Sequence, residues 1–306
     1  MNSRPFFFAS EDHMTIQPET LDLLIHYMHE RERIRLKKEA GEPRPWTTDP
    51  ILANYKFTNV LRANDYTTRW LVKNWYEPNK DDELDTLLMN CAIARYFGTT
   101  EFCEAIGYQD HWQPEIIRSI AARRIANRQK VFTAAYVVTN GGISDAKYNV
   151  VIDHYLDPFV DAIPHLTKLA QDEMRWQPMA EYMMRSLPGF GGKGFMCKEV
   201  LSDFILATSH EIGWEDLYTW SPVGPGAIRG LNRLHGRPAR ESLSPSLALQ
   251  ELREMAAAVA PRLESWMPQF GEELDLHGIQ FQMCEFDKYM RAHTGEGRPK
   301  ANYKPR

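Results

Sequence analysis

The chain lacks the features that most directly assign a protein to a membrane, disulfide-rich or zinc-binding class. Its 306 residues include only four cysteines, Cys91, Cys103, Cys197 and Cys284, which follow no CxxC or Cys/His spacing and are expected to be reduced and mostly buried. No stretch approaches the roughly 20 apolar residues that a membrane-spanning helix needs. The first residues, MNSRPFFFASEDH, also lack the apolar segment and cleavage site of a signal peptide. We therefore expect a cytoplasmic protein with no membrane partner.

The motifs of several large enzyme classes are missing as well. The run GFGGKG, residues 189–194, superficially resembles a phosphate-binding loop, but Gly194 follows Lys193 where a P-loop needs Ser or Thr. No GxSxG, HExxH or strand-associated GxGxxG is present. His26 and His29 stand one helical turn apart without a third ligand, and no acidic cluster is evident. The sequence predicts no metal site and no cofactor, and it leaves a need for Mg²⁺ open.

Composition and charge are those of an ordinary globular protein. Hydrophobic residues make up 43% of the chain and charged residues 25%, with a formal net charge of −5. A negative total argues against binding nucleic acid by overall charge, so contact with DNA requires Lys and Arg to cluster on one face. The length suits one extended helical domain or two interlocked lobes.

Hydrophobic periodicity predicts a mainly α fold. A helix is expected from Pro18 to about Ala40, followed by a Pro-rich extended loop whose Thr and Asp residues cap another helix near Pro50. Residues 51–76 are typical of a helix, an Asn-Asp break and a second helix. Only residues 131–142, VFTAAYVVTNGG, have a strand-like composition, which a buried helix explains equally well. We expect an N-terminal extension over 1–17, a helical domain over 18–290 and a basic tail over 291–306.

The most informative local segment is LPGFGGKGFMCKEVLSDF, residues 187–204. It resembles the hairpin and second helix of a helix-hairpin-helix motif, as found in the helical DNA glycosylases. Gly189 and Gly191 permit a tight turn with exposed backbone N–H groups, and a helix starting after them directs its positive end at a DNA phosphate. The expected fold is a helical bundle with a helix-hairpin-helix motif, DNA glycosylase-like. A plain glycine-rich connection between helices is the alternative.

A glycosylase reaction would need a carboxylate near the start of the helix after the hairpin unit, because positive charge develops on the sugar as the base leaves. The matching segment, VGPGAIRGLNRL, has Gly224, Pro225 and Gly226 where an Asp is expected. Lys193 does stand where bifunctional glycosylase/lyases carry their Schiff-base lysine, and an ungapped count places Glu211 near the acid's position. A glycosylase/lyase therefore stays an alternative.

Three further segments carry a resemblance to one phage-associated family. They are HERERIRLKKEAGEPRPWTTDPILANYKFTNVLRANDYTTRWL, the central AYVVTNGG and the C-terminal MCEFDKYMRAHTGEGRPKANYKP. With the hairpin and VGPGAIRGLNRL they cover roughly residues 25 to 306 and are similar to the hallmark blocks of the α-glutamyl/putrescinyl thymine pyrophosphorylase family. That family is related to the helical domain of 5-hydroxymethyluracil DNA kinases and includes the amino acid:DNA transferases.

The resemblance implies an enzyme of thymine hypermodification that acts on phage DNA in the infected bacterial host. Its substrate would be double-stranded DNA whose 5-hydroxymethyluracil has been phosphorylated by a partner kinase, and its co-substrate a free amino acid. The amine replaces phosphate or pyrophosphate on the 5-methylene carbon, by displacement or by elimination and addition. Because the chain lacks a P-loop, we expect the transfer step. A non-catalytic DNA-binding or kinase-accessory module is the alternative from another class.

Such a reaction needs a cationic grip on the leaving phosphate, a base for the amine, a carboxylate site and aromatic surfaces for an extruded base. CEFDKY, residues 284–289, is the densest polar group. On a helix Glu285, Lys288 and Tyr289 share a face, whereas Asp287 points elsewhere. We expect Glu285 to act as base and Lys288 as phosphate or carboxylate partner, with Asp287 a further catalytic candidate and Tyr289 a substrate-binding one. A solvated Glu/Lys pair is the alternative.

A second group lies in FTNVLRANDYTTRW, where Asn59, Arg62 and Asp65 fall at helical spacing. An Asn amide matches the edge of an extruded thymine and Arg62 suits a phosphate, whereas a helix cap and a surface arginine are the alternatives. The other substrate-binding candidates are Trp46, Asn140 and Arg298. The DNA-binding candidates are Gly189, Gly191, Lys193, Arg31, Arg35, Arg124 and Arg128. An exposed helix face is the alternative for Arg124 and Arg128, and side-chain stems that cover the core are the alternative for Arg31 and Arg35.

Overall fold

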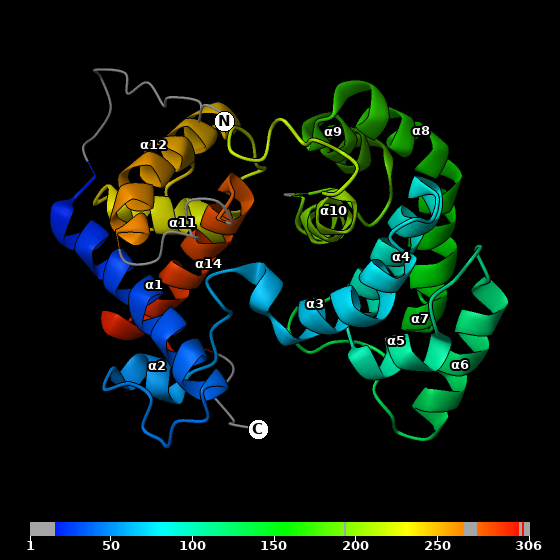
Figure 1. The fold of residues 1–306 in the computed structure, drawn as a ribbon, viewed down its shortest axis with the longest axis horizontal. Coiled ribbons are helices and arrows are strands. Elements are labelled where there is room, and N and C mark those ends of the chain that lie inside the picture. Colours follow the sequence, from blue (N-terminus) through cyan, green and yellow to red (C-terminus); the bar gives the residue numbers. More distant parts are fainter. Residues whose placement is uncertain (1–15, 193, 266–273, 300–301, 303–306) are drawn as a thin grey trace. The chain divides into compact units, whose positions relative to one another are not determined.

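The computed structural model describes residues 16–192, 194–265, 274–299 and 302 (Figure 1). Over these residues the chain is mainly helical and has no β-strand, and the β interaction described is an isolated antiparallel bridge between Tyr55 and Asn302. The prediction of a mainly α fold is confirmed. None of the described helices is long and apolar enough to cross a membrane.

The chain forms two compact units. Unit 1 comprises residues 1–65 and 217–306, and unit 2 comprises residues 66–216. The described helices of unit 1 are α1 (Pro18–Glu39), α2 (Pro50–Asn54), the 3-10 turn η1 (Arg62–Asn64), α11 (Pro225–Leu234), α12 (Pro245–Glu264) and α14 (Leu276–His293). Those of unit 2 are α3 (Tyr66–Leu71), η2 (Val72–Tyr76), η3 (Glu77–Asn79), α4 (Leu84–Phe97), α5 (Thr100–Ile106), α6 (Pro114–Ala126), α7 (Lys147–Asn149), η4 (Val150–Leu156), α8 (Asp157–Glu173), α9 (Trp176–Ser186) and α10 (Phe195–Thr208).

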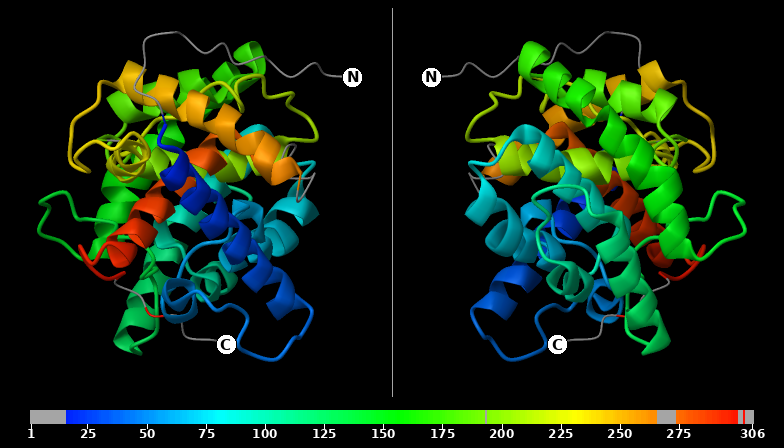
Figure 2. Two further views of the ribbon diagram at one scale, coloured as in Figure 1. Left: turned by 90° about the vertical axis from the view of Figure 1, so that its left-hand side faces the viewer. Right: turned by 90° about the vertical axis from the view of Figure 1, so that its right-hand side faces the viewer.

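Three helices of unit 1, α2, α12 and α14, begin at side chains that cap them. Asp49 Oδ1 accepts hydrogen bonds from the backbone N–H groups of Ile51 and Leu52, at 2.7 and 3.0 Å, at the start of α2. Ser244 and Asp275 cap α12 and α14 in the same way. α1 lies across α12 and α14 (Figures 1 and 2), and the apolar faces of these helices share one core. The first helix and the Asp cap predicted from the sequence are confirmed.

Two glycines allow α11 and α14 to approach closely. A Cβ on Gly230 would overlap the carbonyl oxygen of Met283, and a Cβ on Gly226 would lie 2.9 Å from the Sγ of Cys284. The two glycines are four residues apart, so they share one face of α11. Any larger side chain there would separate the helices, and the polar side chains that project beside the contact would separate with them.

In unit 2, α4 packs between α8 and α10 and carries a buried ion pair. Arg95 Nε donates to Asp203 Oδ2 at 2.6 Å, and Arg95 Nη2 donates to Thr68 Oγ1 at 2.9 Å. The Tyr76 hydroxyl donates to the same Asp203 oxygen at 2.6 Å. The prediction of mostly buried thiols is confirmed, since Cys91, Cys103 and Cys197 are buried and Cys284 of unit 1 is half-buried.

Residues 55–61 form no helix, so the prediction of a longer helix after Pro50 is wrong; α2 ends at Asn54. The backbone of this segment binds side chains from far along the chain. The Thr58 N–H donates to Glu285 Oε2 at 3.0 Å, and Gln282 Nε2 donates to the carbonyl oxygens of Asn59 and Val60 at 3.1 Å. These contacts replace the bonds of a helix, and local sequence periodicity carries no information about them.

Residues 131–142 are neither strand nor helix. Two hydrogen bonds hold the segment against the rest of unit 2. The Thr133 N–H donates to the Phe97 carbonyl at 2.8 Å, and the Tyr155 hydroxyl donates to the Thr139 carbonyl at 2.9 Å. Both alternatives that its composition suggested are therefore wrong.

The glycine-rich segment 187–194 joins α9 to α10. Gly189 has φ 81°, and a Cβ there would overlap the Tyr96 hydroxyl, so only glycine fits. Positive φ angles also occur at Gly192 and Gly194, whereas Gly191 has none. The tight turn predicted at Gly189 is thus present. At Gly191 the backbone has no positive φ, and the neighbouring Gly192 and Gly194 have it instead. Lys193, a further candidate, lies outside the described residues.

Candidate functional site

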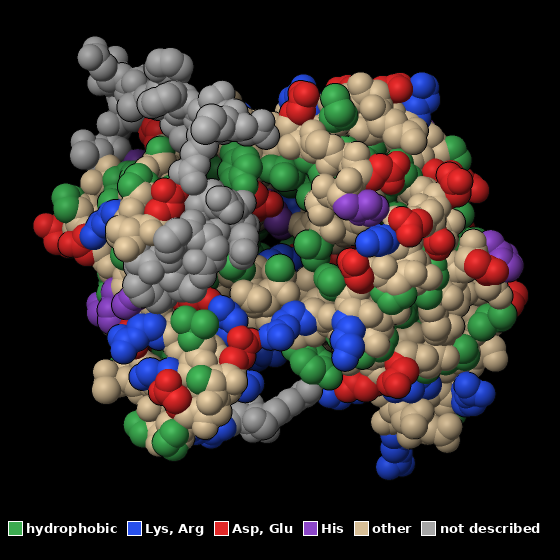
Figure 3. Space-filling model, in the orientation of Figure 1, with side chains coloured by type: hydrophobic (Ala, Val, Ile, Leu, Met, Phe, Trp, Pro, Cys, Tyr) green, Lys and Arg blue, Asp and Glu red, His purple; other side chains and the backbone are tan. Residues whose placement is uncertain are grey.

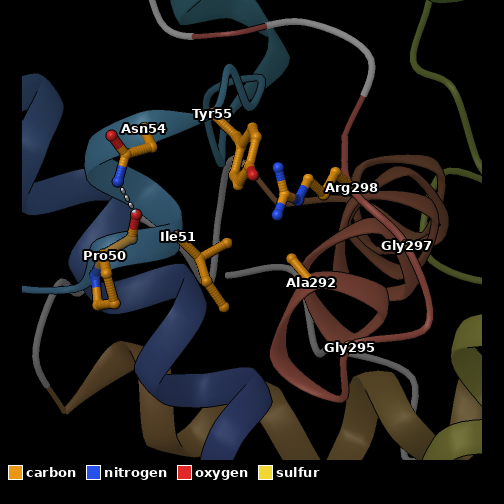
Figure 4. Close-up of a pocket in the computed structure, with 8 residues that line it drawn as sticks. All are labelled: Pro50, Ile51, Asn54, Tyr55, Ala292, Gly295, Gly297 and Arg298. Atoms are coloured by element: carbon orange, nitrogen blue, oxygen red, sulfur yellow. Dashed lines mark hydrogen bonds between the residues drawn. The ribbon is translucent and has the colours of Figure 1, made fainter.

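A pocket of about 490 Å³ lies in unit 1 between α2 and the segment that follows α14. Figure 4 shows the side chains of Tyr55 and Arg298 pointing toward one another across it. Within the described part of the chain no hydrogen bond or ion pair engages the Arg298 guanidinium. The pocket therefore offers a cation and an aromatic ring, on residues from opposite ends of the chain. Its lining residues are Pro50, Ile51, Asn54, Tyr55, Ala292, Gly295, Gly297 and Arg298.

The α2 wall of the pocket is tied to α14 through Asp49. One carboxylate oxygen caps α2, and the other accepts a hydrogen bond from the Tyr289 hydroxyl at 2.7 Å. Burial and this hydrogen bond raise the pKa of Tyr289 well above its usual value, so the hydroxyl stays a donor. His26 Nε2 lies 3.5 Å from the same carboxylate oxygen. Tyr289, predicted to bind substrate, thus positions the pocket wall.

The predicted pair Glu285 and Lys288 is formed, with Lys288 Nζ 2.6 Å from Glu285 Oε2. Both side chains also hold the extended segment after α2: Glu285 Oε2 accepts from the Thr58 N–H, and Lys288 Nζ donates to the Lys56 carbonyl at 3.1 Å. The side chains are 13% and 22% exposed. Helical spacing places them on the face of α14 that leads to Ala292 in the pocket.

Asn59, Arg62 and Asp65 come together around a turn, and the helix on which their spacing was predicted does not form. The Asn59 backbone N–H donates to Asp65 Oδ1 at 3.0 Å, and its amide Nδ2 donates to the Asn64 carbonyl at 2.7 Å. Arg31 Nη2 donates to Asn59 Oδ1 at 2.6 Å. The amide therefore binds the protein itself on both sides.

The remaining candidates on and near α1 and η1 are engaged with partners inside unit 1. Arg62 lies over the ring of Phe281, with 5.1 Å between its Cζ and the centroid. Arg35 pairs with Glu32 and Glu39 on its own helix. The Trp46 indole donates to the Glu42 carbonyl at 2.7 Å. These side chains are not among the residues that line the pocket.

Asp287, predicted to be catalytic, is buried and holds arginines. Its Oδ2 accepts from Arg229 Nε at 2.8 Å, and its Oδ1 accepts from Arg233 Nε at 2.9 Å. Arg291 Nε stands 3.5 Å from Oδ2. With 1% of its side chain exposed, the carboxylate is out of reach of a ligand and instead fixes three guanidiniums at one end of the contact between α11 and α14.

The sequence reasoning missed Arg229 and Arg233 as site residues. The block VGPGAIRGLNRL carries part of the family resemblance. It also places two arginines four residues apart, beside two glycines at the same spacing. That pattern was the available signal. The partner carboxylate of these arginines, Asp287, lies more than 50 positions away, so only the folded chain shows the cluster.

In unit 2, Asn140 and Arg124 bind their own loops. Asn140 Nδ2 donates to the Asp145 carbonyl at 2.9 Å, and Arg124 Nε donates to the Lys130 carbonyl at 3.0 Å. Arg128, just after α6, has a positive φ of 55°. Over the described residues of either unit, no group of three or more His, Cys, Asp and Glu side chains is placed to hold a metal ion.

The surface of unit 1 carries charge of both signs. On the face shown in Figure 3, Lys and Arg side chains gather toward the lower part of this unit, with acidic side chains between them. The last turn of α1 contributes Lys37 and Lys38 to the basic residues of the unit. Basic side chains thus gather on one part of this face in a chain whose total charge is negative.

Comparison with known proteins matches residues 18–298 to the family described as "5-hmdU DNA kinase, helical domain". A curated relative, the "5-hmdU DNA kinase" of Bacillus phage SP10, is 26% identical over 306 aligned positions. The alignment covers 90% of this chain and 45% of that relative, so the chain spans less than half the length of the kinase. No solved structure matches. The predicted link to phage 5-hmdU proteins is confirmed; the narrower transferase assignment stays a prediction.

Proposed function

The chain belongs to the family of the 5-hmdU DNA kinase helical domain, and we propose that it transfers an amino acid to phosphorylated 5-hydroxymethyluracil in phage DNA, as a step of thymine hypermodification. The pocket that joins Tyr55 to an Arg298 without a described partner carries this proposal. Both of its walls come from sequence blocks that resemble the transferases. An arginine in such a pocket suits the carboxylate of a free amino acid, and the tyrosine ring suits the face of an extruded base.

In the proposed reaction the amine nitrogen forms a bond to the 5-methylene carbon, and the carbon–oxygen bond to the phosphate or pyrophosphate breaks. The leaving group takes the bonding electrons, and the amine proton passes to a base. Glu285 is the proposed base: its described hydrogen bonds use Oε2, which leaves Oε1 for the amine. Lys288 positions that carboxylate. Both direct displacement and elimination followed by addition satisfy this balance.

DNA contact is assigned to the helix-hairpin-helix motif proposed for residues 187–204 of unit 2. Gly189 and Gly192 have the positive φ angles of a tight turn, and α10 begins directly after it. Backbone N–H groups at such a helix start suit a DNA phosphate. A glycosylase-like arrangement of the whole bundle is part of this proposal.

The test is mass spectrometry of nucleosides from 5-hydroxymethyluracil DNA treated with a matching kinase, ATP, this protein and mixed amino acids. We expect a new nucleoside that carries the mass of one amino acid and depends on both proteins. Arg298→Ala should lower its yield at limiting amino acid by about 10-fold or more, because a charge-assisted carboxylate contact is lost. Arg262→Ala is the matched control, since Arg262 is surface-exposed and pairs with Asp22.

Glu285→Gln tests the base. Glutamine keeps the size of the side chain and can still accept from the Thr58 N–H, but it takes no proton at neutral pH. Turnover should fall by 10²-fold or more, in the range of about 10²–10⁴ typical of a general base, while DNA affinity stays unchanged. Glu19→Gln, at an exposed position of α1, should change neither. Unchanged turnover in Glu285→Gln would remove this residue from the reaction.

A kinase-accessory module is the second candidate, favoured by the 26% identity to a phage 5-hmdU DNA kinase. It predicts that the protein raises the rate of DNA phosphorylation and that no amino acid appears in the nucleosides. Abasic sites, or a borohydride-trapped complex at Lys193, would instead indicate a glycosylase/lyase. Either result would overturn the transferase proposal.

A further inference from the structure

We propose that Arg229 and Arg291 form a phosphate-binding clamp, set by the buried Asp287 where α11 meets the end of α14. The ligand is a phosphate group on DNA, either the phosphoryl group on the modified base or a backbone phosphate. The proposal rests on the proposed function in taking DNA as the ligand.

The first observation is the way in which the arginines meet Asp287. Arg229 donates to the carboxylate through Nε at 2.8 Å, and Arg291 approaches it through Nε at 3.5 Å. No contact among the described residues uses the terminal nitrogens of either guanidinium, and the side chains are 37% and 39% exposed. Both arginines therefore keep their outer N–H groups for a ligand. The inner edge of Arg229 is fixed by a hydrogen bond, whereas Arg291 pairs with the carboxylate only at ion-pair distance and its buried Nε has no hydrogen-bond partner among the described residues.

The second observation is the balance of charge. Arg233 is the third arginine of the cluster, but its terminal nitrogens bind Glu296 at 2.7 and 3.1 Å. The hydrogen bonds that Arg233 donates to Glu296 and Asp287 raise the pKa of Arg233. Asp287 offsets one of the two remaining cations, so three guanidiniums and two carboxylates leave one net positive charge. This net charge suits an anionic ligand.

The third observation is preorganisation. Free arginine side chains lose conformational entropy when they bind, whereas Arg229 is already hydrogen-bonded to a carboxylate that is 1% exposed, and Arg291 is paired with the same carboxylate. Their common anchor rests on the close contact of α11 with α14, which requires Gly226 and Gly230. Two planar forks from different helices suit the several oxygens of a phosphate better than a single lysine would.

A purely structural ion pair would look different. In unit 2, the Arg95 guanidinium donates through Nε and Nη2 to both oxygens of the Asp203 carboxylate. Both side chains are almost fully buried, at 6% and 2% exposure. The Asp287 cluster instead turns the outer edges of two arginines toward solvent. Stability alone does not require that arrangement, because exposed cations contribute little to it.

The experiment measures binding of the full chain to two DNA duplexes by fluorescence anisotropy, without amino acid. One duplex carries a single phosphorylated 5-hydroxymethyluracil, and the other carries thymine at that position. Arg229→Gln combined with Arg291→Gln should weaken binding by about 10- to 100-fold, as expected for the loss of two charge-assisted contacts. Arg262→Gln, which also removes one surface charge of unit 1, should change binding less than about 2-fold in either duplex.

A loss confined to the phosphorylated duplex assigns the clamp to the base phosphoryl group. An equal loss in both duplexes, with a shallower dependence of affinity on salt, assigns it to the DNA backbone. Unchanged affinity for both duplexes overturns the clamp. Arg229→Lys guards against misfolding: it keeps the charge but not the fork, so a folded Lys variant that still loses affinity supports the clamp.

The binding assay separates this proposal from the proposed function. If the wild-type protein yields no aminoacylated nucleoside but the double variant loses affinity, the transferase proposal fails and the clamp stands. If the double variant binds both duplexes and produces the nucleoside as the wild type does, the clamp fails and the transferase proposal stands.

Discussion

The two units each bury an aspartate against arginine, with opposite consequences. In unit 2, Asp203 receives Arg95 and the Tyr76 hydroxyl, and Arg95 also reaches Thr68, so the partners are used inside the fold. Burial acts to lower the pKa of Arg95, but the charge and hydrogen bonds of Asp203 outweigh it and hold that pKa well above its usual value. This pair joins helices and offers nothing to a ligand.

In unit 1, Asp287 is equally buried but its arginines extend to the surface. The difference lies in the number of donors for one carboxylate: Arg229 and Arg233 each donate to it through Nε. The outer edge of Arg233 binds Glu296, whereas that of Arg229 is left over. The comparison shows that burial of a charge does not tell whether it stabilises or positions. What matters is whether the partner's hydrogen-bonding groups are all used within the fold.

The largest expected effect on stability is the loss of the closed pair, by which we mean the buried Arg95–Asp203 pair whose hydrogen-bonding groups are used within the fold. Asp203→Ala should lower the free energy of unfolding by about 3–5 kcal/mol, because it leaves the Arg95 charge buried without a partner. Urea unfolding followed by circular dichroism measures the change. Asp172→Ala, which removes a surface partner of Lys168, should cost about 0–1 kcal/mol. Similar losses in the two variants would contradict the closed-pair interpretation.

The stability of the protein should depend less on the carboxylate of the open cluster, by which we mean Asp287 and its arginines at the surface of unit 1. We expect Asp287→Ala to cost about 1–3 kcal/mol, because Arg229 and Arg291 can move into water once it is gone, while the buried Arg233 keeps Glu296. The same urea experiment measures it beside Asp203→Ala. If Asp287→Ala proves the more damaging of the two, the distinction between the closed and open clusters is lost.

The close contact of α11 with α14 is the next test. Gly230→Ala adds a Cβ that overlaps the Met283 carbonyl, so the helices must separate at a cost of about 1–3 kcal/mol. Thermal unfolding measures this loss, and phosphorylated DNA should bind more weakly because Arg229 shifts away from Asp287. At Gly213 nothing lies within 4 Å of an added Cβ, so Gly213→Ala is the matched control. Wild-type affinity and stability in Gly230→Ala would show that the contact is not required.

The smallest effect concerns the exposed end of the cluster. Hydrogen bonds from Arg233 and Thr294 lower the pKa of Glu296 to about 2, whereas a free glutamate has a pKa of about 4.3. The pair therefore contributes stability above pH of about 4.3 and loses it as the pH falls toward 2. Glu296→Gln should lower the Tm by a small amount at pH 7, in keeping with a pair worth about 0–1 kcal/mol.

The wild-type and Glu296→Gln unfolding temperatures should converge as the pH falls to about 2, where the carboxylate becomes protonated in the folded protein as well. Calorimetry between pH 2 and 7 follows both proteins, with most pH values set between about 4.3 and 2. A difference in Tm that stays constant over this range would show that the ionised pair is not its source.

The helices themselves were largely predictable. The periodicity from Pro18 and the Asp cap before Pro50 are local signals, and α1 and α2 begin where those signals stand. Such signals work because helix hydrogen bonds and caps join residues only a few positions apart. The interpretation failed at residues 55–61, where the backbone is bound by side chains more than 200 positions away.

The candidate site divides in the same way. The sequence by itself identified CEFDKY and VGPGAIRGLNRL as blocks that resemble one family, and it supplied Glu285, Lys288 and Arg298 as candidates. Only the tertiary structure decided that Asp287 is buried under three arginines and that Arg298 faces Tyr55 across a pocket. A sequence pattern indicates which residues of one helix lie on the same face. The partner that a residue meets on another helix depends on the packing of the whole unit, and here two glycines let α11 approach α14.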